Sequence, residues 1–117
     1  MIRRDGPIVQ KSRSFAIAII KYCDFLSEGK KFIISNQLLK AGTSIGANIF
    51  EAQYAESRLD FIHKMKIAQK EANETLYWLM LCENINKIKI QEELINNLNE
   101  ILAILTKIVT TSKKNLN

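Results

Sequence analysis

Residues 61–82 carry one unbroken helical repeat. Apolar and small side chains recur there at alternating intervals of four and three positions, at Phe61, Met65, Ala68, Ala72, Thr75, Leu79 and Cys82. This spacing keeps all of them on one face of an α-helix and is typical of helices that pack nearly parallel to their neighbours. The long repeat therefore predicts an all-α fold built from packed helices.

The same periodicity appears in three further segments. We expect helices at about residues 8–26, 35–54, 57–86 and 91–111, with Pro7 near the first start, Asp5 as its cap, Gly29 at its end and Ser35 capping the second. Short connections make consecutive helices antiparallel. The sequence thus predicts one domain over residues 1–117, an up-and-down four-helix bundle. Its other buried faces are Phe15, Ile19, Tyr22 or Cys23, and Leu26; Leu38, Gly42, Ile45, Ile49 and Ala52; and Leu94, Leu98, Ile101, Leu105 and Ile108.

The two cysteines, Cys23 and Cys82, each lie inside an apolar run, and no CxxC pair is present. We expect buried free thiols rather than a disulfide or a zinc site. No apolar segment of signal-peptide type follows the charged start, and the apolar run at residues 15–20 is too short to cross a bilayer. We therefore expect a soluble cytoplasmic protein without a membrane partner.

The net charge of +5 favours an acidic partner such as RNA or DNA. Basic residues outnumber acidic ones by eight to three in residues 1–40, whereas residues 41–86 hold four basic and six acidic residues. An amino-acid composition rich in Lys, Asn and Ile is the alternative origin of this charge. The candidate nucleic-acid contacts are Lys11, Arg13, Lys21, Lys30 and Lys31, with Lys66 and Lys70 beside His63 as a second patch.

No pattern of residues indicates an enzyme, a cofactor or a metal. The segment 42–48 has three residues between its glycines where a phosphate-binding loop needs four, and no Lys-Ser/Thr follows. Gly42 and Gly46, one helical turn apart, instead favour the close approach of another helix. The single histidine, His63, is too few for a di-iron site in a bundle core. We interpret Asn48, Glu51 and Glu71 as a structural polar network.

Residues 76–82 are apolar on every side of their helix, and residues 101–105 nearly so. A helix of this kind must be covered on several faces. Because each helix of a small four-helix monomer keeps one face in water, we expect the chain to associate with itself. Trp78 and Leu81 are the candidate interface residues.

Residues 37–52 (QLLKAGTSIGANIFEA) and 60–79 (DFIHKMKIAQKEANETLYWL) closely resemble a bacterial four-helix-bundle family encoded in intervening sequences of large-subunit ribosomal RNA genes. The resemblance implies an antiparallel bundle and a ring-shaped homopentamer. The family is also similar to the accessory protein of diversity-generating retroelements, a basic pentameric barrel that works with a reverse transcriptase and nucleic acid.

Two hypotheses follow for function. The first is a non-enzymatic oligomer that binds nucleic acid, a ribonucleoprotein or a nucleic-acid-processing protein through a basic surface, without reading base sequence. The second is a protein-interaction scaffold whose positive charge is a matter of composition. Steep loss of binding with added salt would distinguish the first from the second.

Overall fold

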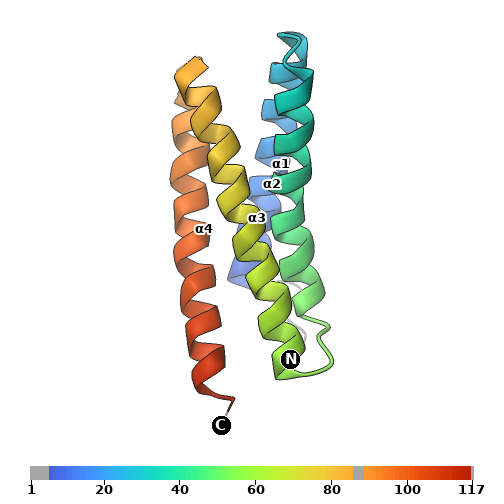
Figure 1. Ribbon diagram of the computed structural model, residues 1–117, viewed down its shortest axis with the longest axis vertical. Coiled ribbons are helices and arrows are strands. Elements are labelled where there is room, and N and C mark those ends of the chain that lie inside the picture. The colour runs from blue at the N-terminus through green and yellow to red at the C-terminus, as the bar shows by residue number, and fades with distance from the viewer. Residues whose placement is uncertain (1–5, 86–88, 117) are drawn as a thin grey trace.

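The computed structural model describes residues 6–85 and 89–116, and this part of the chain is built from helices without any strand (Figure 1). The helices are α1 (Pro7–Glu28), α2 (Phe32–Ala52), α3 (Arg58–Ile85) and α4 (Lys89–Lys114). They correspond one to one to the predicted segments. The prediction of an all-α four-helix bundle is confirmed.

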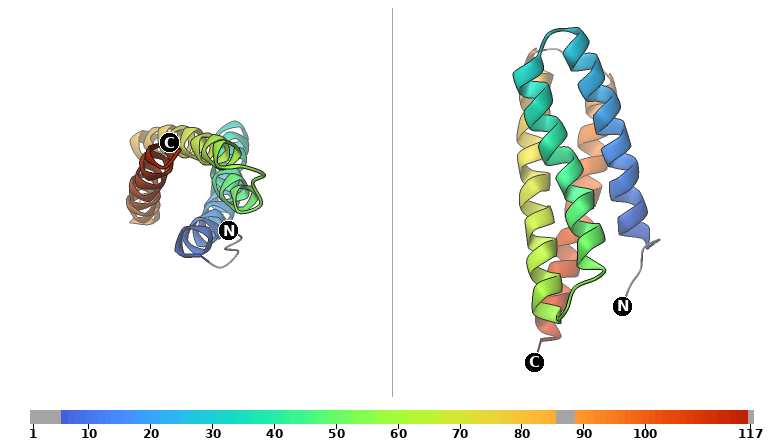
Figure 2. Two further views of the ribbon diagram at one scale, coloured as in Figure 1. Left: turned by 90° about the horizontal axis from the view of Figure 1, so that it is seen from below. Right: turned by 90° about the vertical axis from the view of Figure 1, so that its right-hand side faces the viewer.

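All four helices run along the long axis of a rod of 50 × 21 × 20 Å (Figure 1). Helices that follow one another in the chain also pack against one another, and α1 contacts α4 over a smaller area. Across the described residues, the diagonal pairs α1/α3 and α2/α4 have no backbone contact. Figure 2 shows this arrangement in the view along the rod, with α1 and α3 at opposite corners.

The predicted helix ends are correct to within a few residues, but one cap is wrong. The second helix begins at Phe32, a turn before Ser35. Ser35 is buried, and its hydroxyl donates to the Cys23 carbonyl oxygen at 3.0 Å and lies 3.1 Å from the Ser27 hydroxyl. The hydroxyl therefore ties α2 to α1 instead of capping α2. The predicted cap Asp5 lies outside the described residues.

The turn between α1 and α2 also differs in one detail from the expectation. Gly29 ends α1 as predicted, but the residue in the left-handed conformation is Lys30, with φ of 62°. The turn is closed by the Lys31 N–H, which donates to the Leu26 carbonyl oxygen at 2.9 Å. This pattern satisfies a carbonyl group that the end of the helix would otherwise leave without a partner.

The predicted buried faces are confirmed except at one end of the bundle. Phe61 and Ile108 were expected in the core, yet both are half-exposed, while Ile62 and Val109 are buried. Both half-exposed side chains line a hollow at the end where α1 begins. They face inward as the repeat predicts, but no further layer of side chains covers them there.

The glycines of α2 set the distance between α1 and α2. A Cβ atom placed on Gly42 would lie 2.8 Å from Cγ2 of Ile19, which is too close for two carbon atoms, and Ile19 itself is fully buried. At Gly46 the nearest atom, the Ser12 carbonyl oxygen, would be 3.4 Å away. The predicted close helix approach is therefore enforced at Gly42, whereas Gly46 leaves room for a methyl group.

The two glycines should respond in opposite directions to alanine. In a helix, replacing glycine by alanine stabilises by about 1 kcal/mol, but overpacking a closed core costs about 1–3 kcal/mol. We expect Gly42→Ala to lower the free energy of unfolding by up to about 2 kcal/mol, and Gly46→Ala to raise it by up to about 1 kcal/mol. Urea denaturation of the two variants measures both. Equal stability of the two would contradict this account of the α1–α2 contact.

Candidate functional site

The predicted basic residues of α1 do not form one patch. Lys11 is paired with Glu100 on α4. Arg13 lines a shallow hollow between α1 and α2 together with Phe50. Side chains two residues apart on a helix point about 200° apart around its axis. Lys11 and Arg13 therefore lie on opposite sides of α1. One nucleic-acid strand cannot follow both along the helix axis.

The other predicted cations near the N-terminal half lie at the end of the rod that carries the α1–α2 turn, which we call the upper end. Lys21, Lys30 and Lys31 are exposed there. Asp24 and Glu28 are exposed within the same last turns of α1. The positive charge of this region is therefore partly balanced by carboxylates.

A more uniform basic surface lies on the outward face of α3. His63, Lys66 and Lys70 are exposed and spaced three and four residues apart, so they share one side of the helix. We call them the α3 basic strip. The structure gives Lys66 and Lys70 no ion pair with a described carboxylate, in contrast to Lys64, whose Nζ lies 3.0 Å from Glu51.

The α3 basic strip continues into polar and aromatic side chains. Asn73 and Tyr77 are exposed on the same side of α3. Glu71 is half-buried on another side of the helix, and Glu74, one turn beyond Lys70, accepts a hydrogen bond from the Trp78 indole at 3.2 Å. Because α1 and α3 occupy opposite corners of the bundle, the strip and the α1 cations face away from each other (Figure 2). The α3 basic strip is thus separate from the other predicted basic residues.

The predicted polar network of Asn48, Glu51 and Glu71 is not formed by the described hydrogen bonds. The Asn48 amide donates to the Ser44 carbonyl oxygen of its own helix at 2.8 Å. Glu51 is exposed and pairs with Lys64. Each of these two groups has a partner on its own helix or at the surface, so no buried polar link between the helices is required. Within residues 6–85 and 89–116, no three His, Cys, Asp or Glu side chains lie close enough together to hold a metal ion.

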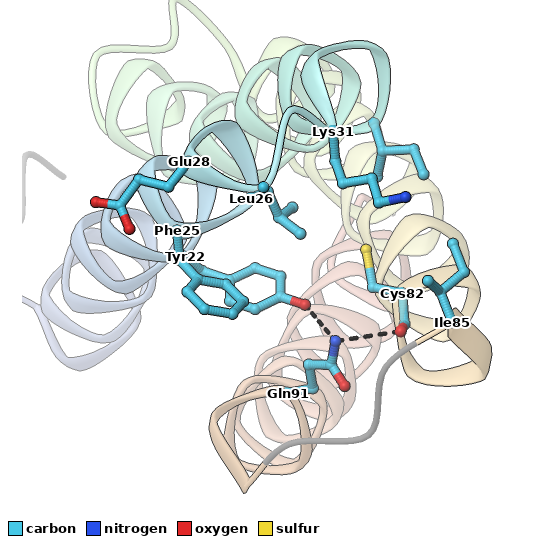
Figure 3. A pocket seen from close by; sticks show the side chains of 10 residues that line it. Tyr22, Phe25, Leu26, Glu28, Lys31, Cys82, Ile85 and Gln91 are labelled. Atoms are coloured by element: carbon cyan, nitrogen blue, oxygen red, sulfur yellow. Dashed lines mark hydrogen bonds between the residues drawn. The ribbon is translucent and has the colours of Figure 1, made fainter.

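Instead, a buried polar contact that the sequence did not reveal lies at the upper end. The Gln91 amide donates to the Tyr22 hydroxyl and, at 3.2 Å, to the Cys82 carbonyl oxygen (Figure 3). It joins α1, α3 and α4. Position 91 lies three residues before Leu94 and so continues the buried repeat of α4, which is the signal that could have identified it.

Burial also sets the chemistry of the thiols and the phenol in this region. Loss of solvation raises the pKa of Tyr22 to about 12 and that of Cys23 to about 11, and it raises the pKa of Cys82 as well. All three groups are therefore uncharged near neutral pH and unsuited to nucleophilic attack. Both cysteines are free, as predicted. Cys23 and Cys82 are on diagonal helices whose Cα atoms stay more than 8 Å apart, which is too far for a disulfide.

The apolar stretch of α3 is only partly covered by the bundle. Trp78 and Leu81, the predicted interface residues, are half-buried, and Trp78 packs against the core of its own chain. Tyr77 and Met80 are more exposed, at 57% and 52%. The surface available to a partner on α3 is therefore centred on Tyr77 and Met80.

A second group of exposed apolar side chains lies over α1 and α2. Phe50 lines a hollow with Ala16, and Ile20 follows Ala16 by one turn on the same side of α1. Ile17 and Leu39 extend this group along the two helices. We call Ile17, Ile20, Leu39 and Phe50 the α1–α2 apolar face.

No helix in the described part of the chain is long and apolar enough to cross a membrane.

Comparison with known proteins places the chain in a family. A search of curated proteins found no significant match. The chain is similar to a crystal structure of a protein of unknown function from the S23 ribosomal protein family of Bacteroides thetaiotaomicron, with 47% sequence identity and a TM-score of 0.84 over 87% of this chain and 97% of that one. Residues 4–107 match the profile of the family described as 23S rRNA-intervening sequence protein. The chain belongs to this 23S rRNA-intervening sequence protein family.

Proposed function

We propose that the protein is a non-enzymatic, self-associating helical bundle that binds nucleic acid through the α3 basic strip. The observation that carries the proposal is the exposure of His63, Lys66 and Lys70 on one side of α3, where neither lysine forms an ion pair with a described carboxylate. Lysines in such a row contact phosphates, and these contacts position a nucleic acid without reading its sequence.

The strip suits a flexible single strand better than a groove of a duplex. From His63 to Lys70 it extends about 10 Å along the helix, which is a short contact. The exposed ring of Tyr77 lies two turns beyond Lys70 on the same side, where a base can stack on it. We therefore propose a single-stranded nucleic acid as the ligand, with single-stranded RNA as the probe.

Self-association is the second part of the proposal. Two lysines bind phosphates weakly, but copies of the strip held in one assembly bind at high effective concentration. The α1–α2 apolar face is the proposed contact between copies, because it exposes large side chains that a lone protomer leaves in water. Ser35 contacts Cys23, Gly42 lies at Ile19 and Gly46 lies at Ser12, and this reversed order supports antiparallel packing of α1 and α2. On the sequence resemblance alone, we propose that the assembly is a ring-shaped homopentamer and that it acts with a nucleic-acid-processing protein.

The alternative function is a protein-interaction scaffold. The exposed apolar side chains of α3, Tyr77 and Met80, favour it because they offer a protein partner a surface at one side of the same helix. In this alternative the lysines are solvated side chains, and binding of nucleic acid at low salt is absent.

The nucleic-acid proposal predicts which lysines matter. Lys66→Glu/Lys70→Glu should weaken binding of a single-stranded RNA at 50 mM salt by at least tenfold in a gel-shift titration, because it reverses the charge of the α3 basic strip. Lys30→Glu/Lys31→Glu, which changes the net charge equally, should weaken binding much less. Binding by the parent should fall by orders of magnitude between roughly 50 and 200 mM salt if six or more phosphates are engaged by the assembly.

The same titration can reject the proposal. Equal loss in the two double variants would mean that only net charge matters. Absence of any complex with the parent at low salt, with single- or double-stranded probes, would leave the scaffold function in its place.

The assembly prediction uses exposed positions so that the fold is preserved. Ile20→Glu/Phe50→Glu should give smaller particles than the parent in sedimentation velocity, because two carboxylates would be buried without partners in the contact. Ile33→Glu is the control, since Ile33 is 81% exposed and lies outside the α1–α2 apolar face. Exposed substitutions usually change stability by less than about 0.5 kcal/mol, and circular dichroism would verify that the helices remain. A parent that sediments as a monomer at micromolar concentration would end the proposal of self-association.

A further inference from the structure

The upper end of the rod contains a partly enclosed cavity of about 340 Å³ (Figure 3). All four helices contribute to its wall. The lining is mostly apolar and includes Phe25 and Leu26 from α1, Ile34 from α2, and Cys82 and Ile85 from α3. The buried contact between Tyr22 and Gln91 lies on the side of α1 and α4.

The cavity lies where the described residues leave the core open at this end. Farther along the rod, the centre is filled by fully buried side chains such as Leu38, Leu79 and Leu98. At the upper end, Phe25 and Ile85 remain 45% and 58% exposed and stand around an opening instead of meeting across it. Most of the lining is apolar, so an apolar molecule that covers it removes apolar surface from water.

Among the described residues that line the cavity, the charged ones are Lys31 and Glu28. In Figure 3 the Lys31 side chain lies along the rim on the side of Cys82, whereas the Glu28 carboxylate points away from the cavity. Of these two charged groups, the Lys31 ammonium group is therefore the candidate to contact a bound molecule. The phenol of Tyr22 and the amide of Gln91 are already joined by a hydrogen bond and form a neutral polar wall.

We propose that this cavity binds a small apolar carboxylate, with its hydrocarbon part between Phe25, Leu26 and Ile85 and its carboxylate at Lys31. The size fits, because an apolar cavity of about 150 Å³ holds benzene, so this larger space accommodates an aromatic ring with a short acidic chain. The proposal is independent of nucleic-acid binding. The cavity lies at the upper end and takes an apolar ligand, whereas the nucleic-acid proposal concerns the lysines on the outward face of α3.

The proposal is tested by titration of the isotope-labelled protein, without nucleic acid, while the backbone amide signals are followed by NMR. The probes are phenylacetate, the neutral toluene and the cationic phenethylamine. Phenylacetate should shift the signals of Tyr22, Cys82 and Gln91 with saturation at a dissociation constant on the order of 1 mM. Toluene should shift the same signals with weaker affinity, and phenethylamine should bind most weakly.

Two pairs of variants separate the charge from the cavity. Lys31→Gln should weaken phenylacetate binding roughly two- to fivefold, as expected for an exposed ion pair, and leave toluene binding unchanged. Lys30→Gln, at the neighbouring position outside the cavity lining, should change neither. Ile85→Trp should fill the opening and abolish the shifts, whereas Ile90→Trp, at an equally exposed position outside the lining, should preserve them.

Three results would overturn the proposal. The absence of any phenylacetate-induced shift around the cavity rejects the site, and so do shifts that persist unchanged in Ile85→Trp. Toluene binding as tight as phenylacetate binding, with no effect of Lys31→Gln, rejects the carboxylate as the ligand class.

Discussion

The close contact between α1 and α2 at Gly42 determines how the rest of the bundle can pack. Without a side chain at this position, the backbone of α2 approaches Ile19 so closely that a methyl group would overlap it. Ser35 adds a hydrogen bond between the same two helices at the upper end. With α1 and α2 fixed in this way, α3 packs against α2, and α4 closes against α3. The exposed faces of the bundle are those that this packing of the helices leaves uncovered.

Most of the fold could be predicted from the sequence, because buried positions of a packed helix recur every three to four residues and the apolar residues of this chain follow that spacing. The repeat from Met65 to Cys82 lies in the core as expected. The differences are at ends, where periodicity carries less information. Ser35 resembles a helix cap in sequence, but its hydroxyl finds a better partner on α1, and only the packing of two helices reveals that partner. Phe61 follows the repeat and is still half-exposed, because the rod ends there.

The candidate sites were less predictable, since a surface depends on which helices lie side by side. Lys11 and Arg13 are close in sequence, yet one pairs with Glu100 and the other lies at the opposite side of the helix. The spacing of His63, Lys66 and Lys70 could be read from the sequence, whereas the absence of an ion pair at these lysines, among the described residues, required neighbouring helices to be placed. The cavity at the upper end could not be inferred at all, because it is formed by residues from all four helices.

The smaller contact between α1 and α4 has a consequence for folding kinetics. These two helices are the farthest apart in the chain, so bringing them together costs the largest loop-closure entropy of any neighbouring pair in the bundle. They also share less surface to offset that cost. Contacts between successive helices are local and form early in proteins of this type. We therefore expect the α1–α4 seam to form last during folding and to be the first boundary to open when the native bundle fluctuates.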